Sequence, residues 1–175
     1  MLLSLLACAV AWRPDAVGRF DLQVPPGWSV THNVRSFGND HLILSQPELR
    51  STISIELVLA DADSRRLPLD LLAEVRAISA GRSLGVENTR GRMDQLDVDG
   101  HEAWAVTGRR RWRLITADYS MVVLRVGNRV GIVTLQSPEN SLDRSLVAWS
   151  IVLSTLRFPR DRIPADAPTF LPEEG

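Results

Sequence analysis

The chain has 175 residues, a formal net charge of −1 and 45% hydrophobic residues. This size and hydrophobic content suit one globular domain with its own core. The near-zero charge excludes an overall positive field that would draw the protein to nucleic acid. The single cysteine excludes an internal disulfide and the metal sites that need paired cysteines.

The N-terminus resembles a targeting segment. Residues 1–7 are apolar except for Ser4, and they end on a small residue before Cys8. This pattern is typical of a bacterial lipoprotein signal, in which the chain is cut before a cysteine that carries a diacylglyceryl group. The run is short and no basic residue precedes Arg13, which a start site placed too far downstream would explain. We predict a signal peptide over 1–7 and a lipid anchor on Cys8; the alternative is a buried or frayed segment with an incidental cysteine.

A tether over 8–18 then leads into a predicted folded domain over 19–158. From residue 19 to 24, apolar and polar side chains alternate as in a half-buried strand, which Pro25-Pro26-Gly27 ends. Further strands are predicted over 28–34, 41–45 and 52–59.

A helix is predicted over 68–81, because Pro68 suits a first helical position and Leu71, Val75 and Ile78 share one face. Strands are expected from 86 to 136, with a strong hairpin signal at Asp99-Gly100. The two most apolar of these strands, 121–126 and 130–135, are predicted to be central.

The last element is a helix over 138–156, with Ser137 as its cap. Its apolar residues recur at helical spacing and form a stripe for the sheet, namely Leu142, Leu146, Trp149, Leu153 and Leu156. Residues 159–175 contain four prolines and are predicted to be a flexible tail. The order of strands, helix, strands and helix indicates an α+β fold with an antiparallel sheet.

One charged run stands out, Arg109-Arg110-Arg111-Trp112-Arg113. On a strand, Arg109, Arg111 and Arg113 project from one face, and Arg110 and Trp112 from the other. The three guanidinium groups are candidates for binding phosphate or carboxylate, with Trp112 adding cation–π contacts. The alternative is a solvated strand face whose charges are offset by nearby carboxylates.

No catalytic, cofactor or metal motif is recognised elsewhere. His32, His41 and His101 fall in separate elements without metal-ligand spacing, and we expect scattered surface histidines. Three alternating aspartates before the hairpin lack the glycine and closing glutamate of a calcium loop, so an exposed strand face is expected at Asp94, Asp97 and Asp99. Trp28, Trp104 and Trp149 are expected in the core.

Three local signatures resemble the PsbP-like superfamily, including its bacterial DcrB-like members. They are a strand ending in Pro-Gly-Trp over 20–28, the hairpin 98–103, and a helix running into an aromatic residue over 151–158. The resemblance implies a curved antiparallel sheet with two main helices packed on it, an α/β/α sandwich without catalytic residues. Known members of this superfamily bind other proteins, and they include the Eag-type chaperones of type VI secretion effectors.

We therefore predict a non-enzymatic, lipid-anchored binding or assembly module of the bacterial envelope, at the outer membrane because Ala9 rather than Asp follows Cys8. Its expected partners are the membrane, through the anchor, and another protein or an anionic envelope component. The alternative is a cytoplasmic chaperone of the Eag type, which the domain alone would fit equally well.

Overall fold

The computed structural model describes residues 15–17, 20–36, 39–82, 87–112 and 115–158. The predicted signal peptide, Cys8, Arg113 and the tail over 159–175 lie outside the described residues, as does the side chain of Trp112. The placement of the anchor, and the boundaries of tether, domain and tail, therefore stay predictions. Residues 15–17, which we expected within the tether, form a short strand, β1 (Asp15–Val17).

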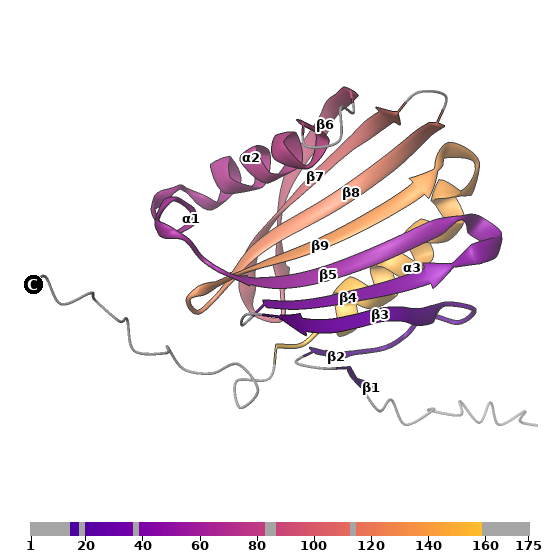
Figure 1. The fold of residues 1–175 in the computed structure, drawn as a ribbon, viewed down its shortest axis with the longest axis horizontal. Helices are drawn as coiled ribbons and strands as arrows, with labels where there is room; N and C mark the ends of the chain where they lie inside the picture. The colour runs from indigo at the N-terminus through magenta and orange to yellow at the C-terminus, as the bar shows by residue number, and fades with distance from the viewer. Residues whose placement is uncertain (1–14, 18–19, 37–38, 83–86, 113–114, 159–175) are drawn as a thin grey trace, which may run out of the picture.

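A twisted seven-stranded antiparallel sheet forms the centre of the fold (Figure 1). The strand order is β3-β4-β5-β9-β8-β7-β6, so neighbouring strands are joined mainly by hairpins, and β9 and β8 lie inside the sheet as predicted. The strands are β3 (Ser29–Ser36), β4 (Asn39–Gln46), β5 (Ser51–Leu59), β6 (Glu87–Val98), β7 (His101–Trp112), β8 (Ile115–Val126) and β9 (Arg129–Pro138). Strand β2 (Phe20–Leu22) pairs with β1 in a separate two-stranded sheet.

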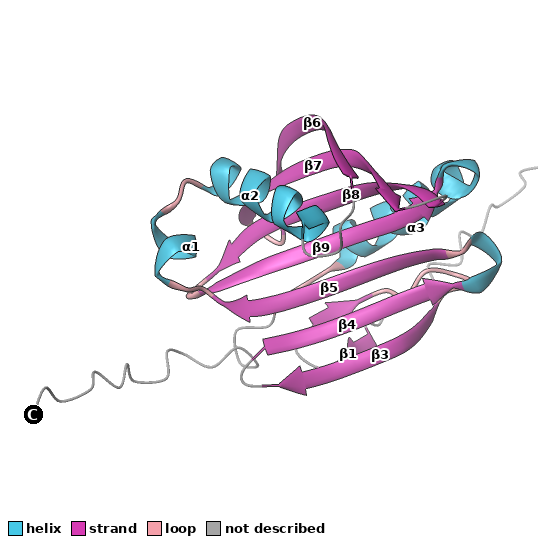
Figure 2. Ribbon diagram, turned by 45° about the horizontal axis from the view of Figure 1, so that its top comes forward, coloured by secondary structure: helices cyan, strands magenta, loops and turns pink. Residues whose placement is uncertain are grey.

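Helices lie on both faces of the large sheet (Figure 2). The short α1 (Ala62–Arg66) leads into α2 (Leu69–Arg82), which packs on β6, β7 and β8. On the opposite face, α3 (Leu142–Thr155) packs on β9 and β2. Two 3-10 turns, Pro47–Leu49 and Glu139–Ser141, connect elements at the sheet's end. The predicted α+β architecture, an antiparallel sheet with two main helices on it, is confirmed.

The α3 face carries the larger hydrophobic core. Alternation along β5 places Ile53, Ile55 and Leu57 on this face, each fully buried, as the sequence predicts. The core also takes in Phe20 and Leu22 from β2, together with Trp28, Leu42, Leu44, Val122, Leu124, Val133, Leu135, Trp149, Val152, Leu156 and Phe158. The small β1–β2 ribbon is thus attached to the sheet through this core, and a backbone bridge between Asp21 and Arg157 adds to the connection.

Helix α2 packs through a different face from the one the sequence indicates. Its buried residues are Leu69, Leu72, Ala73 and Ala77, which meet the smaller core of the opposite sheet face. Leu71, Val75 and Ile78, which form the apolar stripe in the sequence, are 38–46% exposed. Apolar residues surround this helix almost completely, so periodicity alone does not select a face; the sheet takes the one with two alanines.

The start of the last helix also differs from the prediction. Ser137 is no cap, because β9 continues through Pro138 and α3 begins at Leu142. Its hydroxyl oxygen is instead buried within 2.9–3.1 Å of those of Ser51 and Ser145. The third pair of this cluster, Ser145 and Ser51, is 2.9 Å apart. The stripe of α3 is partly as predicted: Trp149 and Leu156 are buried, whereas Leu146 is 36% exposed.

The predicted Asp99-Gly100 hairpin is confirmed. It joins β6 to β7, and both residues have positive φ, 56° and 76°, as a type I′ turn requires. The Asp97 carboxylate accepts a hydrogen bond from Gly100 N, and that of Asp99 accepts one from Phe158 N at 2.8 Å. These aspartates thus fix the turn and the end of the domain; Asp97 is exposed as expected, whereas Asp99 is half-buried.

Candidate functional site

The arginine run lies on β7 and alternates between the two faces of the sheet, as the sequence predicts for a strand. Arg109 faces the α3 side, where it contacts Asp118 of β8 and Glu139 of the 3-10 turn after β9. Arg110 faces the α2 side, where it lies on the ring of Tyr119. Neighbouring arginines therefore occupy two different surroundings.

Arg109 is held by two carboxylates. Its Nε lies 2.8 Å from Asp118 Oδ1, and its Nη2 lies 3.2 Å from Glu139 Oε1. The hydrogen bond to Asp118, together with both negative charges, raises the pKa of Arg109 above its ordinary value. Nearby carboxylates thus offset the charge of Arg109, as the alternative interpretation of the row predicts. Arg111 is exposed, and it forms no ion pair among the residues that the structure describes.

An open groove of about 610 Å³ runs beside Arg109 on the α3 side. Arg109, Asp118 and Ser120 supply polar groups, while Leu142 and Leu146 of α3 supply an apolar wall. Thr107 and two glycines, Gly91 and Gly108, complete the part of the lining contributed by β6 and β7. The surface therefore combines a paired guanidinium group with the half-buried Leu142 and the exposed Leu146, and we define it as the Arg109 groove.

Arg110 is half-buried on the α2 side. Its Cζ lies 4.5 Å from the centroid of the Tyr119 ring, a cation–π distance. The Nε and Nη2 atoms are buried and have no hydrogen-bond partner among the residues that the structure describes. Burial disfavours the charged form and lowers the pKa of Arg110, an effect that Tyr119 partly offsets.

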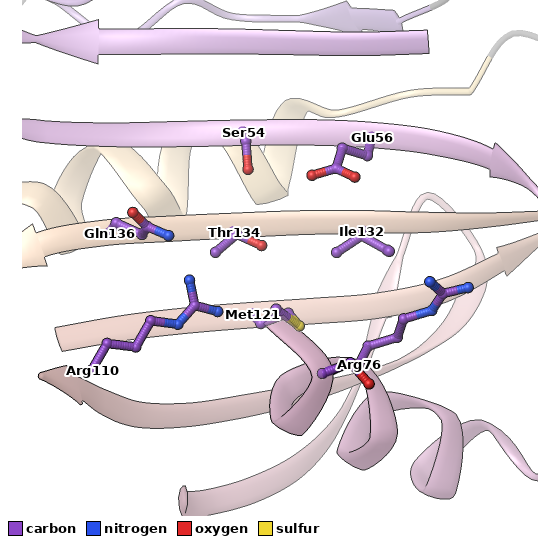
Figure 3. Close-up of a pocket in the computed structure, with 9 residues that line it drawn as sticks. Ser54, Glu56, Arg76, Arg110, Met121, Ile132, Thr134 and Gln136 are labelled. Carbon is purple, nitrogen blue, oxygen red and sulfur yellow. The ribbon is translucent and has the colours of Figure 1, made fainter. Parts of the chain in front are cut away.

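A pocket of about 310 Å³ lies next to Arg110, between α2 and the exposed part of the sheet (Figure 3). Hydroxyl and amide groups line one side, and Met121 and Ile132 form an apolar part. Arg76 of α2 and Glu56 of β5 stand at the far end from Arg110. The remaining lining residues are Ser54, Ser79, Thr134 and Gln136. We define this hollow as the Arg110 pocket.

Two of the three histidines lie together, contrary to the prediction that all are scattered. The rings of His32 and His41 are in edge contact, with centroids 5.2 Å apart, because β3 and β4 are neighbours. His41 Nε2 lies 4.0 Å from Glu56 Oε1, whereas His101 packs on Phe158 elsewhere. In the described part of the chain, no three His, Cys, Asp or Glu side chains are arranged to hold a metal ion.

The expected core tryptophans are largely confirmed. Trp28 and Trp149 are buried, at 8% and 7% exposure. Trp104 is half-buried against the α2-side core, and its indole N–H donates to Glu102 at 3.3 Å.

Sequence reasoning missed the Arg110 pocket. Alternation along β7 places Trp104 and Val106 on the α2 face, against its core, and Arg110 continues the same series. The sequence does contain one signal of the pocket: Arg110 is charged, although the alternation along β7 predicts a buried residue at its position. The sequence gives no signal for the face of the sheet that each helix covers. Arg76 lines the pocket from α2, which is far from β7 in the sequence.

Solved structures with a similar fold were found, although no family model and no curated protein matches the sequence. The cyanobacterial PsbP (CyanoP) from Synechocystis sp. PCC 6803 aligns with a TM-score of 0.63 and 13% identity, over 84% of this chain and 91% of its own. The fold of this chain is PsbP-like. At this identity the similarity establishes the architecture alone.

Two further structures have the same fold in different settings. The Ran-binding protein Mog1p of Saccharomyces cerevisiae aligns with a TM-score of 0.58 and 11% identity, over 87% of this chain and 97% of its own. LpqN of Mycobacterium tuberculosis, which is involved in cell envelope biogenesis, aligns with a TM-score of 0.50 and 17% identity, over 80% and 83% of the two chains. The PsbP-like fold thus occurs in a protein involved in cell envelope biogenesis and in a Ran-binding protein.

Proposed function

We propose that this PsbP-like chain is a non-enzymatic, lipid-anchored binding module of the bacterial envelope. The Arg109 groove is the observation that carries the binding part of the proposal. It presents a guanidinium group beside the apolar side chains of Leu142 and Leu146. Such a combination of one charge-directed and one hydrophobic contact suits a protein partner. The similarity to a Ran-binding protein and to a protein involved in cell envelope biogenesis supports this class of function.

The partner is expected to be acidic at the point of contact. Arg109 is already paired with Asp118 and Glu139, but Glu139 is 69% exposed and its contact is the longer one. Exposed ion pairs contribute little stability, about 0–1 kcal/mol. A carboxylate or phosphate of the partner therefore replaces Glu139 at low cost, and Arg111 and Arg113 add to the attraction.

The predicted anchor on Cys8 would give this module an envelope location. No helix among the described residues is long and apolar enough to cross a membrane. A lipid on Cys8 would attach the domain through the predicted tether, and Ala9 favours the outer membrane as its destination.

Metabolic labelling with a lipid precursor tests the anchor. We expect the protein to be labelled and to sediment with membranes, and the Cys8→Ser variant to lose both properties. If labelling of Cys8→Ser equals that of the wild type, Cys8 does not carry an anchor. A protein that stays in the cytoplasmic fraction without lipid supports instead the Eag-type chaperone.

Binding to anionic vesicles or to acidic proteins captured from the envelope tests the arginine row. Replacing Arg109, Arg111 and Arg113 with Gln should weaken binding in a salt-sensitive way. The matched control removes three exposed arginines elsewhere, Arg50, Arg66 and Arg144, and so makes the same change in net charge. Equal effects of the two triple variants would mean that net charge, and no specific surface, is responsible.

A further inference from the structure

The Arg110 pocket lies on the face of the sheet opposite the Arg109 groove and is independent of it. Helix α2 covers β6, β7 and β8, but β5 and β9 extend beyond the helix. The guanidinium group of Arg110 lies at the edge of this covered region and extends toward Gln136 and Met121 (Figure 3). It is therefore partly removed from water and still borders an open hollow.

The unused donors of Arg110 are the main observation. A guanidinium group carries five N–H donors and remains charged in proteins. The Nε and Nη2 atoms of Arg110 are buried, and no described residue accepts a hydrogen bond from them. Buried charged donors are normally paired. The face of Tyr119 attracts the cation, but it does not satisfy these in-plane N–H groups.

The charges that line the pocket favour an anion. Arg110 and Arg76 are two cations, and Glu56 is the single carboxylate among the lining residues. Glu56 lies near His41, 4.0 Å from its Nε2, and Arg76 donates to Ser64 Oγ at 3.2 Å. In the part of the chain that the structure describes, no carboxylate forms an ion pair with Arg110. The pocket is thus left with positive charge at the Arg110 end.

The rest of the lining indicates what else the ligand contains. Met121 and Ile132 offer an apolar surface beside the guanidinium group, and Ser54, Thr134 and Gln136 offer hydrogen bonds. A volume of about 310 Å³ is at the lower end of the range for small-molecule sites. A short aliphatic chain with one charged head group matches this size and composition.

We propose that the Arg110 pocket binds a small organic oxyanion, with its carboxylate or phosphate group on the guanidinium of Arg110 and its aliphatic part against Met121 and Ile132. The oxyanion accepts hydrogen bonds from the donors that have no acceptor in the protein, after a small rotation of the flexible side chain. Arginine suits this role because its planar fork can hold two oxygens at once.

Isothermal titration of the full chain tests the proposal with three probes that share one aliphatic chain: hexanoate, hexyl phosphate and hexylamine. We expect saturable binding of at least one of the two anions below about 10 mM and weaker or no binding of hexylamine. Binding of hexanoate alone, or of hexyl phosphate alone, supports the proposal and identifies the head group. Saturable binding of hexylamine as tight as that of the anions, or no binding of either anion, overturns it.

Two variants place the binding site. Arg110→Gln should weaken anion binding by about tenfold or more, because the charged bidentate contact is lost. Ser54→Trp keeps Arg110 and fills the pocket from β5, so it should abolish binding as well. The control is Arg144→Gln, an exposed arginine on the other side of the sheet, which should bind as the wild type does. If neither pocket variant changes the affinity, the anion binds elsewhere and the proposal is wrong.

Discussion

The two faces of the sheet differ in how completely they are covered. On the α3 face, buried residues extend from β2 and Trp28 across β4, β5, β9, β8, β7 and β6, and α3 packs on this layer. On the α2 face, the helix packs mainly on β6, β7 and β8, and the side chains of β5 that point to this side are half-buried. The α3 face therefore carries the larger core, and the α2 face leaves the pocket beside Arg110 open between the helix and β5.

Arg109 and Arg110 show the same contrast on one strand. Arg109 is exposed and has two carboxylate partners, whereas Arg110 is half-buried and has unused donors. These two neighbouring arginines therefore allow a direct comparison of a paired and an unpaired guanidinium group within one strand. A paired charge at the surface can exchange one exposed partner for another, whereas buried donors without an acceptor call for one.

The largest effect is expected for Trp149→Ala in the α3-face core. Trp149 is 7% exposed and packs in the main cluster, so the cavity should lower the free energy of unfolding by about 3–5 kcal/mol. Urea unfolding measures the change, with Val147→Ala as control because Val147 is 63% exposed on the same helix. A loss below about 1 kcal/mol for Trp149→Ala would mean that this helix face is assigned wrongly.

Neighbouring leucines of α2 test the face through which this helix packs. Leu72 is 2% exposed and Leu71 is 44% exposed. We expect Leu72→Ala to cost about 2–4 kcal/mol and Leu71→Ala about 0.5 kcal/mol. Thermal unfolding of the two variants measures the difference. If Leu71→Ala were the more destabilising variant, α2 would pack on the sheet through Leu71, Val75 and Ile78, as the sequence pattern indicates.

The smallest effect is expected for Arg109→Gln. The Arg109 side chain is 49% exposed and that of Asp118 is 13% exposed. Because the guanidinium group stays hydrated, its loss should cost about 1 kcal/mol or less. The effect should shrink further at high salt, because exposed charges are screened. A loss above about 2 kcal/mol, independent of salt, would show that Arg109 is a structural residue and would remove it from the proposed binding surface.

The sequence predicts well those features that depend on local pattern. The alternation in β5, the turn at Asp99-Gly100 and the opposite directions of Arg109 and Arg110 all follow from neighbouring residues, and the structure has each of them. Each of these features needs only strand geometry or a positive φ, which a few residues determine.

Features that depend on distant contacts were not predicted. Ser137 looks like a helix cap because Pro138 follows it, but its hydroxyl is buried beside those of Ser51 and Ser145, which the sheet and α3 bring to it. The Arg110 pocket likewise needs Arg76 from α2 and Glu56 from β5. Local periodicity carries no information on which elements will meet, so such sites become visible only in three dimensions.

The most direct test of the central contrast is the stability of Arg110→Met, measured by urea unfolding beside its binding of hexanoate. Methionine keeps an unbranched apolar chain and removes the buried donors. The lost cation–π contact is worth about 0.5–1 kcal/mol, and the relieved cost of unpaired buried donors about 1–3 kcal/mol. We therefore predict unchanged or higher stability together with loss of anion binding. A variant that is destabilised by more than about 1 kcal/mol and still binds hexanoate would contradict the account.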